Sequence, residues 1–148
     1  MSNEGLNRIL HANILVLNLS NNNLKSSSFL YSVPNLVFLN VSNNDLQELD
    51  ALSHCIYIEE VIFSHNKVSL FPNMSKAKDL ALVDASFNLL HSFENLALLS
   101  ANRKLRVCNL SHNPITRKVD YRNILKKILT QVLAFDVFDV VIEILSSS

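Results

Sequence analysis

The sequence predicts an α/β fold, a right-handed solenoid of five short repeats with a parallel sheet on its concave face and a helical cap at its C-terminal end. Three observations lead to this prediction. A pattern of apolar residues and asparagine recurs five times, leucine and asparagine supply 26 and 19 of the 148 residues, and an amphipathic stripe follows the last copy. Repetition at a fixed interval of about 20 to 50 residues is typical of proteins that stack similar units.

Composition limits the alternatives. Apolar residues make up 49% of the chain and charged residues 18%, which excludes an intrinsically disordered protein. The formal net charge is zero, so no overall charge favours nucleic acid or a membrane surface. One glycine and three prolines argue against glycine-rich phosphate loops. We therefore expect a folded domain of ordinary size.

The five copies begin at positions 14, 36, 58, 80 and 105, at intervals of 22, 22, 22 and 25 residues. Each fits the pattern L-x-x-L-x-L-x-x-N-x-L, with other apolar residues allowed at the leucine positions. The fourth and sixth positions alternate with period two, which predicts one buried face of a short strand. The expected organisation is a short N-terminal cap over 1–13, five repeats over 14–115, and a C-terminal cap with an apolar tail over 116–148.

The ninth position of every copy is asparagine. An amide can donate to carbonyls and accept from backbone N–H groups where the chain leaves a strand. We interpret this column as a structural asparagine ladder, consisting of Asn22, Asn44, Asn66, Asn88 and Asn113.

The pattern resembles that of leucine-rich repeat proteins. Apolar residues three apart, such as Phe71, Met74 and Ala77, predict tight 3₁₀-like turns on the outer side. Repeats of 22 residues with this spacing resemble the short class that includes the regulatory subunits of protein phosphatase type one.

After the last repeat, apolar residues from Tyr121 to Val132 follow a helical spacing, and Asp120 is the expected N-cap. The junction Asn113-Pro114-x-Thr116-x-Lys118-x-x-Tyr121-Arg122 resembles the C-terminal cap of the spliceosomal A-prime proteins. Thr130 stands where that cap prefers proline. The resemblance covers about residues 14–136. The tail after Asp136 is apolar, and it is expected to pack on the cap, to form an extra strand or to serve as a docking segment.

The arrangement of reactive side chains argues against an enzyme. Only His65 and His112 share a repeat position, and they lie two strands apart, roughly 10 Å, too far to bind one metal ion. Cys108 is a core position and Cys55 lies on the outer side, so neither has a partner for nucleophilic chemistry. Serine fills the seventh position of all five copies, which indicates a repeated structural role. We expect no catalysis, no metal and no cofactor.

The concave face is the expected binding surface, because its solvent-facing columns are unusually apolar and such patches mark interaction sites. The alternative is that β-branched residues simply suit strands. The predicted partner-binding residues combine aromatic and aliphatic anchors with charged neighbours: Val37, Phe38, Glu59, Glu60, Leu82, Asp84, Phe87 and Arg106.

Charge is divided along the chain although its sum is zero. Residues 45–94 carry a balance of −5 and residues 103–127 a balance of +7. The basic end is either a solvated cap helix or a contact site for RNA phosphates or an acidic partner.

These observations predict a non-catalytic protein-interaction module that binds a protein partner on its concave face, as a monomer or in a hetero-complex. The alternatives are an A-prime-like ribonucleoprotein subunit, a regulatory subunit of a protein phosphatase, or a component of a ciliary motor. The N-terminal residues show no apolar run of signal-peptide length, so an intracellular location, cytoplasmic or nuclear, is expected. No association with a membrane is expected.

Overall fold

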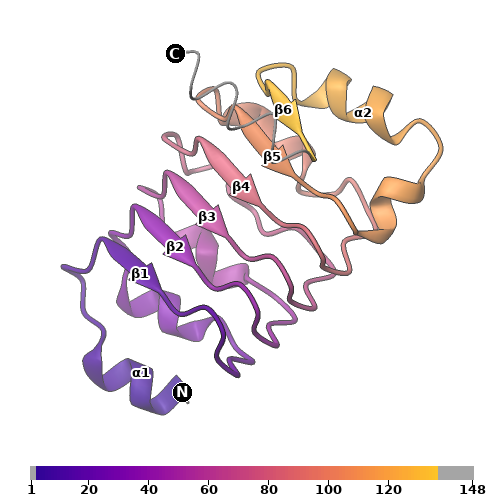
Figure 1. Cartoon of the computed structure of the whole chain (residues 1–148). Helices are drawn as coiled ribbons and strands as arrows, with labels where there is room; N and C mark the ends of the chain where they lie inside the picture. The colour runs from indigo at the N-terminus through magenta and orange to yellow at the C-terminus, as the bar shows by residue number, and fades with distance from the viewer. Residues whose placement is uncertain (1–2, 137–148) are drawn as a thin grey trace.

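The computed structural model describes residues 3–136, and these form one curved stack of coils (Figure 1). The predicted tail over 137–148 lies outside the described residues. Helix α1 (Asn3–Ile9) precedes strand β1 (Val16–Asn18), and β2 (Phe38–Asn40), β3 (Glu60–Ile62), β4 (Leu82–Asp84) and β5 (Val107–Asn109) follow. The C-terminal end holds α2 (Tyr121–Ile128) and β6 (Ala134–Phe135).

All six strands form one parallel sheet in the order β1-β2-β3-β4-β5-β6. Equivalent repeat positions pair directly, so Val16 faces Phe38, Phe38 faces Glu60 and Glu60 faces Leu82. The sheet has one strand more than the five predicted repeats, because the end of the cap adds β6 beside β5. The predicted α/β solenoid with a parallel sheet on its concave face and a helical cap is confirmed.

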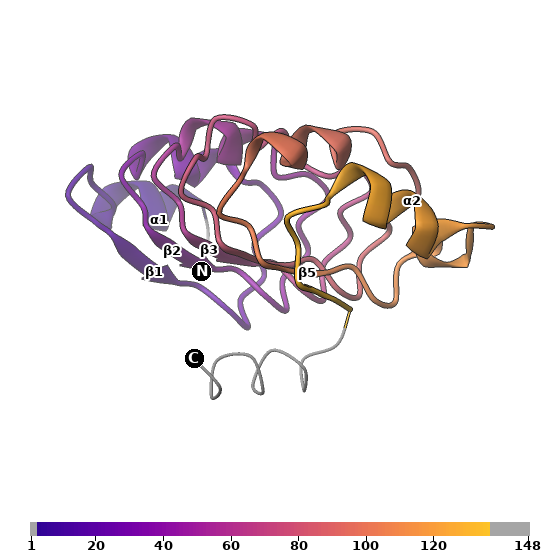
Figure 2. The same cartoon turned by 90° about the horizontal axis from the view of Figure 1, so that it is seen from above.

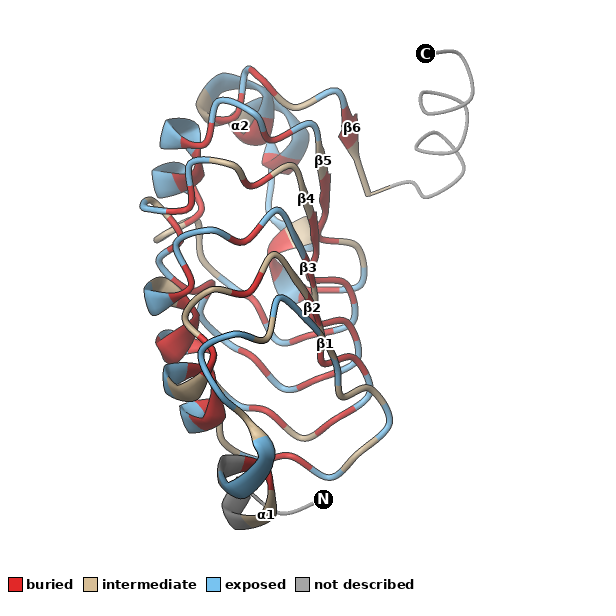
Figure 3. Cartoon of the chain, turned by 90° about the vertical axis from the view of Figure 1, so that its left-hand side faces the viewer, coloured by how far each residue is buried: buried red, intermediate tan, exposed pale blue. Residues whose placement is uncertain are grey.

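Buried residues recur along the strands and the outer turns that face them (Figure 3), and the apolar ones among them form one core. In the second to fifth repeats, the fourth and sixth positions are all buried, and Leu39, Val41, Val61 and Phe63 have no exposed surface. In the first repeat Leu17 and Leu19 are only partly buried, because no earlier repeat covers them. The two-residue alternation therefore does place one face of each strand in the core.

Short 3₁₀ turns form the convex side, opposite the sheet (Figure 2). They are η1 (Ser28–Ser32), η2 (Asp50–His54) and η3 (Ala97–Ala101), and η4 (Pro114–Arg117) follows the last full repeat. The spacing of Leu49, Leu52 and Cys55 matches η2, and all three side chains are buried. The third repeat has no assigned helix at Phe71, Met74 and Ala77, although these side chains are buried as well.

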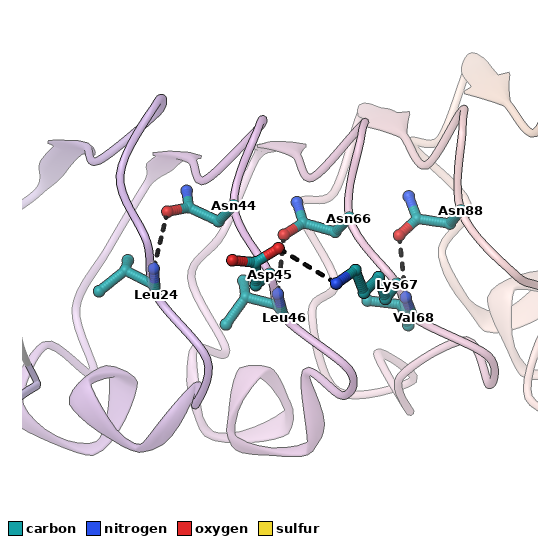
Figure 4. Close-up of polar contacts among 8 residues, drawn as sticks. All are labelled: Leu24, Asn44, Asp45, Leu46, Asn66, Lys67, Val68 and Asn88. Atoms are coloured by element: carbon teal, nitrogen blue, oxygen red, sulfur yellow. Dashed lines mark hydrogen bonds and ion pairs between the residues drawn. The ribbon is translucent and has the colours of Figure 1, made fainter.

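The asparagine ladder joins neighbouring repeats (Figure 4). The Asn66 side-chain amide donates to the carbonyl oxygens of Val41 in the preceding repeat and Phe63 in its own repeat, at 3.0 and 3.1 Å. Its Oδ1 atom accepts the backbone N–H of Leu46 at 3.0 Å. Asn44, Asn88 and Asn113 make the same set of bonds. Each asparagine thus satisfies buried backbone groups that the sheet does not reach.

Three of the five seventh-position serines share the same local structural partner, a polar side chain two residues earlier. Ser42 and Ser111 each donate from the hydroxyl and from the backbone N–H to Oδ1 of the asparagine two residues earlier. Ser86 makes the same pair of bonds to Asp84, at 2.7 Å for the hydroxyl and 3.1 Å for the N–H. This contact closes the turn that follows the strand in these three repeats, and in the first repeat the Ser20 N–H donates to Asn18 in the same way.

The C-terminal cap differs in detail from the sequence prediction. Helix α2 ends at Ile128, although the apolar stripe continues to Val132, because the chain turns there to reach β6. Asp120 occupies the N-cap position, but it has a left-handed φ of 63° and its side chain makes no capping bond. Asp136 closes the cap, since its carboxylate accepts the Leu110 N–H at 2.5 Å and the Tyr121 hydroxyl at 2.8 Å.

Over residues 3–136, neither helix has the length and apolar character that a membrane span requires.

Candidate binding surface on the concave face

One row of side chains crosses the whole concave face. It takes one residue from each strand, in register, and we call it the third-position row: Val16, Phe38, Glu60, Leu82, Val107 and Ala134. Val16 is 66% exposed, Phe38, Leu82 and Val107 are partly exposed, and Ala134 is buried. Apolar residues therefore occupy the row on both sides of Glu60, which is its one charged member.

Two neighbouring carboxylates lie in the middle of this surface. Glu59 and Glu60 are both exposed. Glu60 is the first residue of β3, and Glu59 directly precedes the strand. Lys104 makes a 2.5 Å ion pair with Asp79, and the charge of Glu59 adds to the effect of Asp79 in raising the pKa of the lysine. Within residues 3–136, no hydrogen bond or ion pair engages the Glu60 carboxylate.

Asp84 differs from the exposed acid that the sequence led us to expect. Its side chain is only 5% exposed, and its Oδ1 accepts both bonds from Ser86. Asp84 occupies the column that holds Asn40 and Asn109 in other repeats, and it plays the same turn-closing role there. It therefore contributes negative charge beneath the concave surface and little contact area.

Phe87 lies away from Phe38 and Leu82, in the turn that follows β4. It has a φ of 55° and stacks between His65 and His112, with ring centroids 4.2 and 4.1 Å away and interplanar angles of 11° and 12°. The ring remains 42% exposed. The sequence placed Phe87 and Phe38 in one anchor, whereas the structure brings Phe38 and Leu82 near Glu60 and assigns Phe87 to a ring stack at the edge.

Arg106 precedes β5 and is exposed, but its guanidinium group is engaged locally. Nη1 donates to the carbonyl oxygens of Arg103 and Leu105 at 2.7 and 3.1 Å, and to that of Gln131 at 3.4 Å. Arg106 therefore connects the last full repeat to the cap. Val37 is partly exposed and lies next to Phe38, where it can extend the apolar row.

The basic residues of the C-terminal end are dispersed. Lys104 is paired with Asp79, and the Lys118 ammonium lies 5.8 Å from the centre of the Phe93 ring. Arg122, Lys126 and Lys127 are exposed along α2. This arrangement leaves the helix face as the densest positive surface of the cap.

Two buried polar side chains at the junction with the cap could not be predicted from the repeat. The Asn102 amide donates to the carbonyl oxygens of Met74 and Ala77, and the Gln131 amide donates to those of Leu99 and Asn102. Both residues lie outside the repeated pattern, so spacing gave no signal for them. Asn102 thus joins the outer segment of the fourth repeat to that of the third, and Gln131 holds the cap against the outer turn of the fourth repeat.

Both cysteines are buried thiols. Burial raises the pKa of Cys55 to about 11 and raises that of Cys108 further, with the nearby Asp136 and Asp84 carboxylates acting in the same direction. A thiol held in its neutral form is a poor nucleophile. Cys55 and Cys108 therefore act as core residues.

Comparison with solved structures finds the same architecture in several proteins. An internalin C2 from Listeria monocytogenes superposes with a TM-score of 0.70 at 18% identity, over 82% of this chain and 50% of that chain. The Drosophila melanogaster SNF/U2A' complex gives a TM-score of 0.66 at 21% identity, over 92% of this chain and 82% of that chain. A leucine-rich repeat protein of Leptospira interrogans gives a TM-score of 0.64 at 20% identity, over 85% of this chain and 38% of that chain.

This chain thus spans half the length of the internalin and less of the Leptospira protein. No protein-family model matches the sequence, and no curated protein sequence matches it either. The likenesses to solved structures concern the fold, and they agree with the parallel-sheet solenoid described above. On these grounds the chain has the fold of leucine-rich repeat proteins.

Proposed function

We propose that this protein is a non-catalytic interaction module that binds a protein partner on its concave face. The third-position row supports this proposal most directly, because four partly or fully exposed apolar residues line up across five strands. Val16 and Phe38 are neighbours on one side of Glu60, and Leu82 and Val107 are neighbours on the other. Exposed apolar residues grouped in this way mark interaction sites in soluble proteins. Aromatic residues such as Phe38 typically contribute a large part of the binding energy of such surfaces.

The test is affinity purification of the full chain with quantitative mass spectrometry. Leu82→Asp introduces a charge in the centre of the row, while Leu98→Asp does the same on the convex side, where Leu98 in η3 is 40% exposed. We expect Leu82→Asp to lose the specific partners and Leu98→Asp to retain them. Partners that survive Leu82→Asp but not Leu98→Asp would place the binding surface on the convex side and contradict the proposal.

A second candidate is a ribonucleoprotein subunit similar to A-prime proteins, with a folded partner on the concave face and RNA near the cap. It is favoured by the coverage of the U2A' comparison, which extends over 92% of this chain. The exposed cations Arg122, Lys126 and Lys127 of α2 would contact phosphates. Such contacts make affinity fall steeply with salt.

A salt titration of binding to a labelled RNA hairpin separates the two candidates. The ribonucleoprotein candidate requires binding that weakens with salt and is lost in the triple variant Arg122→Gln, Lys126→Gln and Lys127→Gln. Absence of RNA binding at low salt would remove this candidate and leave the protein-binding proposal unchanged.

A further inference from the structure

Glu60 is a charged residue in an otherwise apolar row. Its partners in register are Phe38 on β2 and Leu82 on β4, so an aromatic and an aliphatic side chain flank the carboxylate. The adjoining strands lie about 4.8 Å away on either side. A carboxylate between apolar neighbours is a costly feature for a surface that becomes buried, unless a cation meets it there.

The other charged groups of this face do not provide that cation. Arg106 donates to three backbone carbonyls at the cap, and Lys104 is paired with Asp79. Glu59 adds to the negative charge, and Asp84 lies next to Leu82 beneath the surface. The centre of the concave face is therefore negative.

We propose that the partner element on this face is a helix with one basic side chain that pairs with Glu60, between apolar side chains that contact Phe38 and Leu82. This inference rests on the proposed function and specifies the chemistry of the partner at the same site. An acidic or neutral residue at the centre of the partner helix would leave the Glu60 carboxylate buried without a counter-charge.

The spacing of the row suits a helix that runs across the strands. Successive strands are separated by about 4.8 Å. Residues three and four apart on a helix rise by about 4.5 and 6 Å and lie on one face. A basic residue with apolar residues three or four positions before and after it would thus match the order Phe38, Glu60, Leu82.

The experiment is selection of helices from a displayed library against the full chain. The library presents a single helix with seven positions of one face randomised to apolar, acidic, basic and neutral residues. We expect lysine or arginine at one central position, with apolar residues three or four positions to each side. Selection against Glu60→Arg is expected to yield aspartate or glutamate at that central position.

Affinity measurements on one selected helix complete the test. Glu60→Arg is expected to weaken its binding at least tenfold, and replacement of its basic residue by glutamate is expected to restore binding to that variant. The matched control is Glu94→Arg, which reverses an exposed carboxylate in the loop before η3. This control is expected to leave affinity unchanged.

The outcomes separate the two proposals. Helices that require Leu82 but show no basic residue, or that bind Glu60→Gln as tightly as the wild type, would overturn the inference while the concave binding surface stands. In that case Glu60 serves to limit aggregation of the apolar row. Failure to enrich any helix would overturn the inference. Selected helices that bind Leu82→Asp as tightly as the wild type would overturn the inference and would also contradict the concave face as the binding surface.

Discussion

At the scale of single residues, the asparagine ladder contributes stability out of proportion to its size. Asn66 is 8% exposed and connects two repeats through bonds to the Val41 and Phe63 carbonyls and the Leu46 N–H. Removal of its amide leaves the buried Leu46 N–H without a partner, while the Val41 and Phe63 carbonyls keep their bonds from Asn44 and Asn88.

We therefore predict that Asn66→Ala lowers the free energy of unfolding by about 1–3 kcal/mol, the cost of leaving the buried Leu46 N–H without a partner. Chemical denaturation monitored by circular dichroism measures this change. The control is Asn23→Ala, at an exposed site, which should change stability by less than about 0.5 kcal/mol. Equal effects of the two substitutions would contradict the role of the ladder.

Phe87, unlike Asn66, is expected to contribute little net stability to the fold. A bulky side chain is rare at positive φ, whereas asparagine and histidine occupy the same turn position in the other repeats. The left-handed conformation costs about 1–3 kcal/mol. Stacking on His65 and His112 offsets that cost, since each ring pair contributes about 0.5–1.5 kcal/mol.

Phe87→Asn should consequently change the free energy of unfolding by no more than about 1 kcal/mol, although it removes a phenyl ring and both stacks. The comparison is Phe63→Ala, at a fully buried core position, which should cost about 3–5 kcal/mol. Urea denaturation of both variants gives the result. A loss above 2 kcal/mol for Phe87→Asn would show that the stack outweighs the backbone strain.

At the scale of elements, the strands and the C-terminal cap differ in how far the sequence predicted them. The fourth- and sixth-position alternation located all five repeat strands, because these positions turn toward the core in every repeat and are fully buried from the second repeat on. The end of α2 and the strand β6 could not be predicted from helical spacing. Leu129 stays buried after the helix ends, so one apolar stripe serves two different backbone conformations.

The candidate binding surface was also predicted from the sequence only in part. The repeat assigned Phe38, Glu60 and Leu82 to one row, since register follows from equal spacing. It assigned Phe87 to a different repeat position, but it could not show that the Phe87 ring stacks between His65 and His112, because that stack depends on the left-handed backbone of the turn. It also could not show that the Ser86 hydroxyl donates a hydrogen bond to the Asp84 carboxylate, because this bond depends on the turn that follows the strand.

The closure of the cap depends on Asp136. We predict that Tyr121→Phe speeds hydrogen exchange at the Leu110 amide, because the carboxylate that accepts this N–H loses its bond to the Tyr121 hydroxyl. Exchange measured by NMR should increase at Leu110 and β6 and remain unchanged at β2 and β3. The exposed Tyr57→Phe is the control. Uniform acceleration over all strands would instead indicate global destabilisation.

At the scale of the whole molecule, several groups make stability fall at alkaline pH. Burial raises the pKa of Cys55 to about 11 and also raises the pKa values of Cys108 and Tyr121. A group with a raised pKa in the folded state contributes its full stabilisation below the unfolded pKa, about 8.5 for cysteine and 10 for tyrosine. That contribution is lost as pH rises, because the unfolded chain releases the proton first.

The melting temperature should therefore be nearly constant from pH 7 to 8 and fall from pH 9 to 11, with a shallower fall in Cys108→Ala. Calorimetry over this range measures the effect. A melting temperature that rises between pH 9 and 11 would contradict the assigned direction of these pKa shifts.

The account of the molecule depends on the concave face being the surface that partners contact. Titration calorimetry of a selected helix against Leu82→Asp and Leu98→Asp tests this claim most directly, since the two substitutions place the same charge on opposite sides of the stack (Figure 3). We predict at least a tenfold loss of affinity for Leu82→Asp and wild-type affinity for Leu98→Asp. The reverse order of effects would contradict the account.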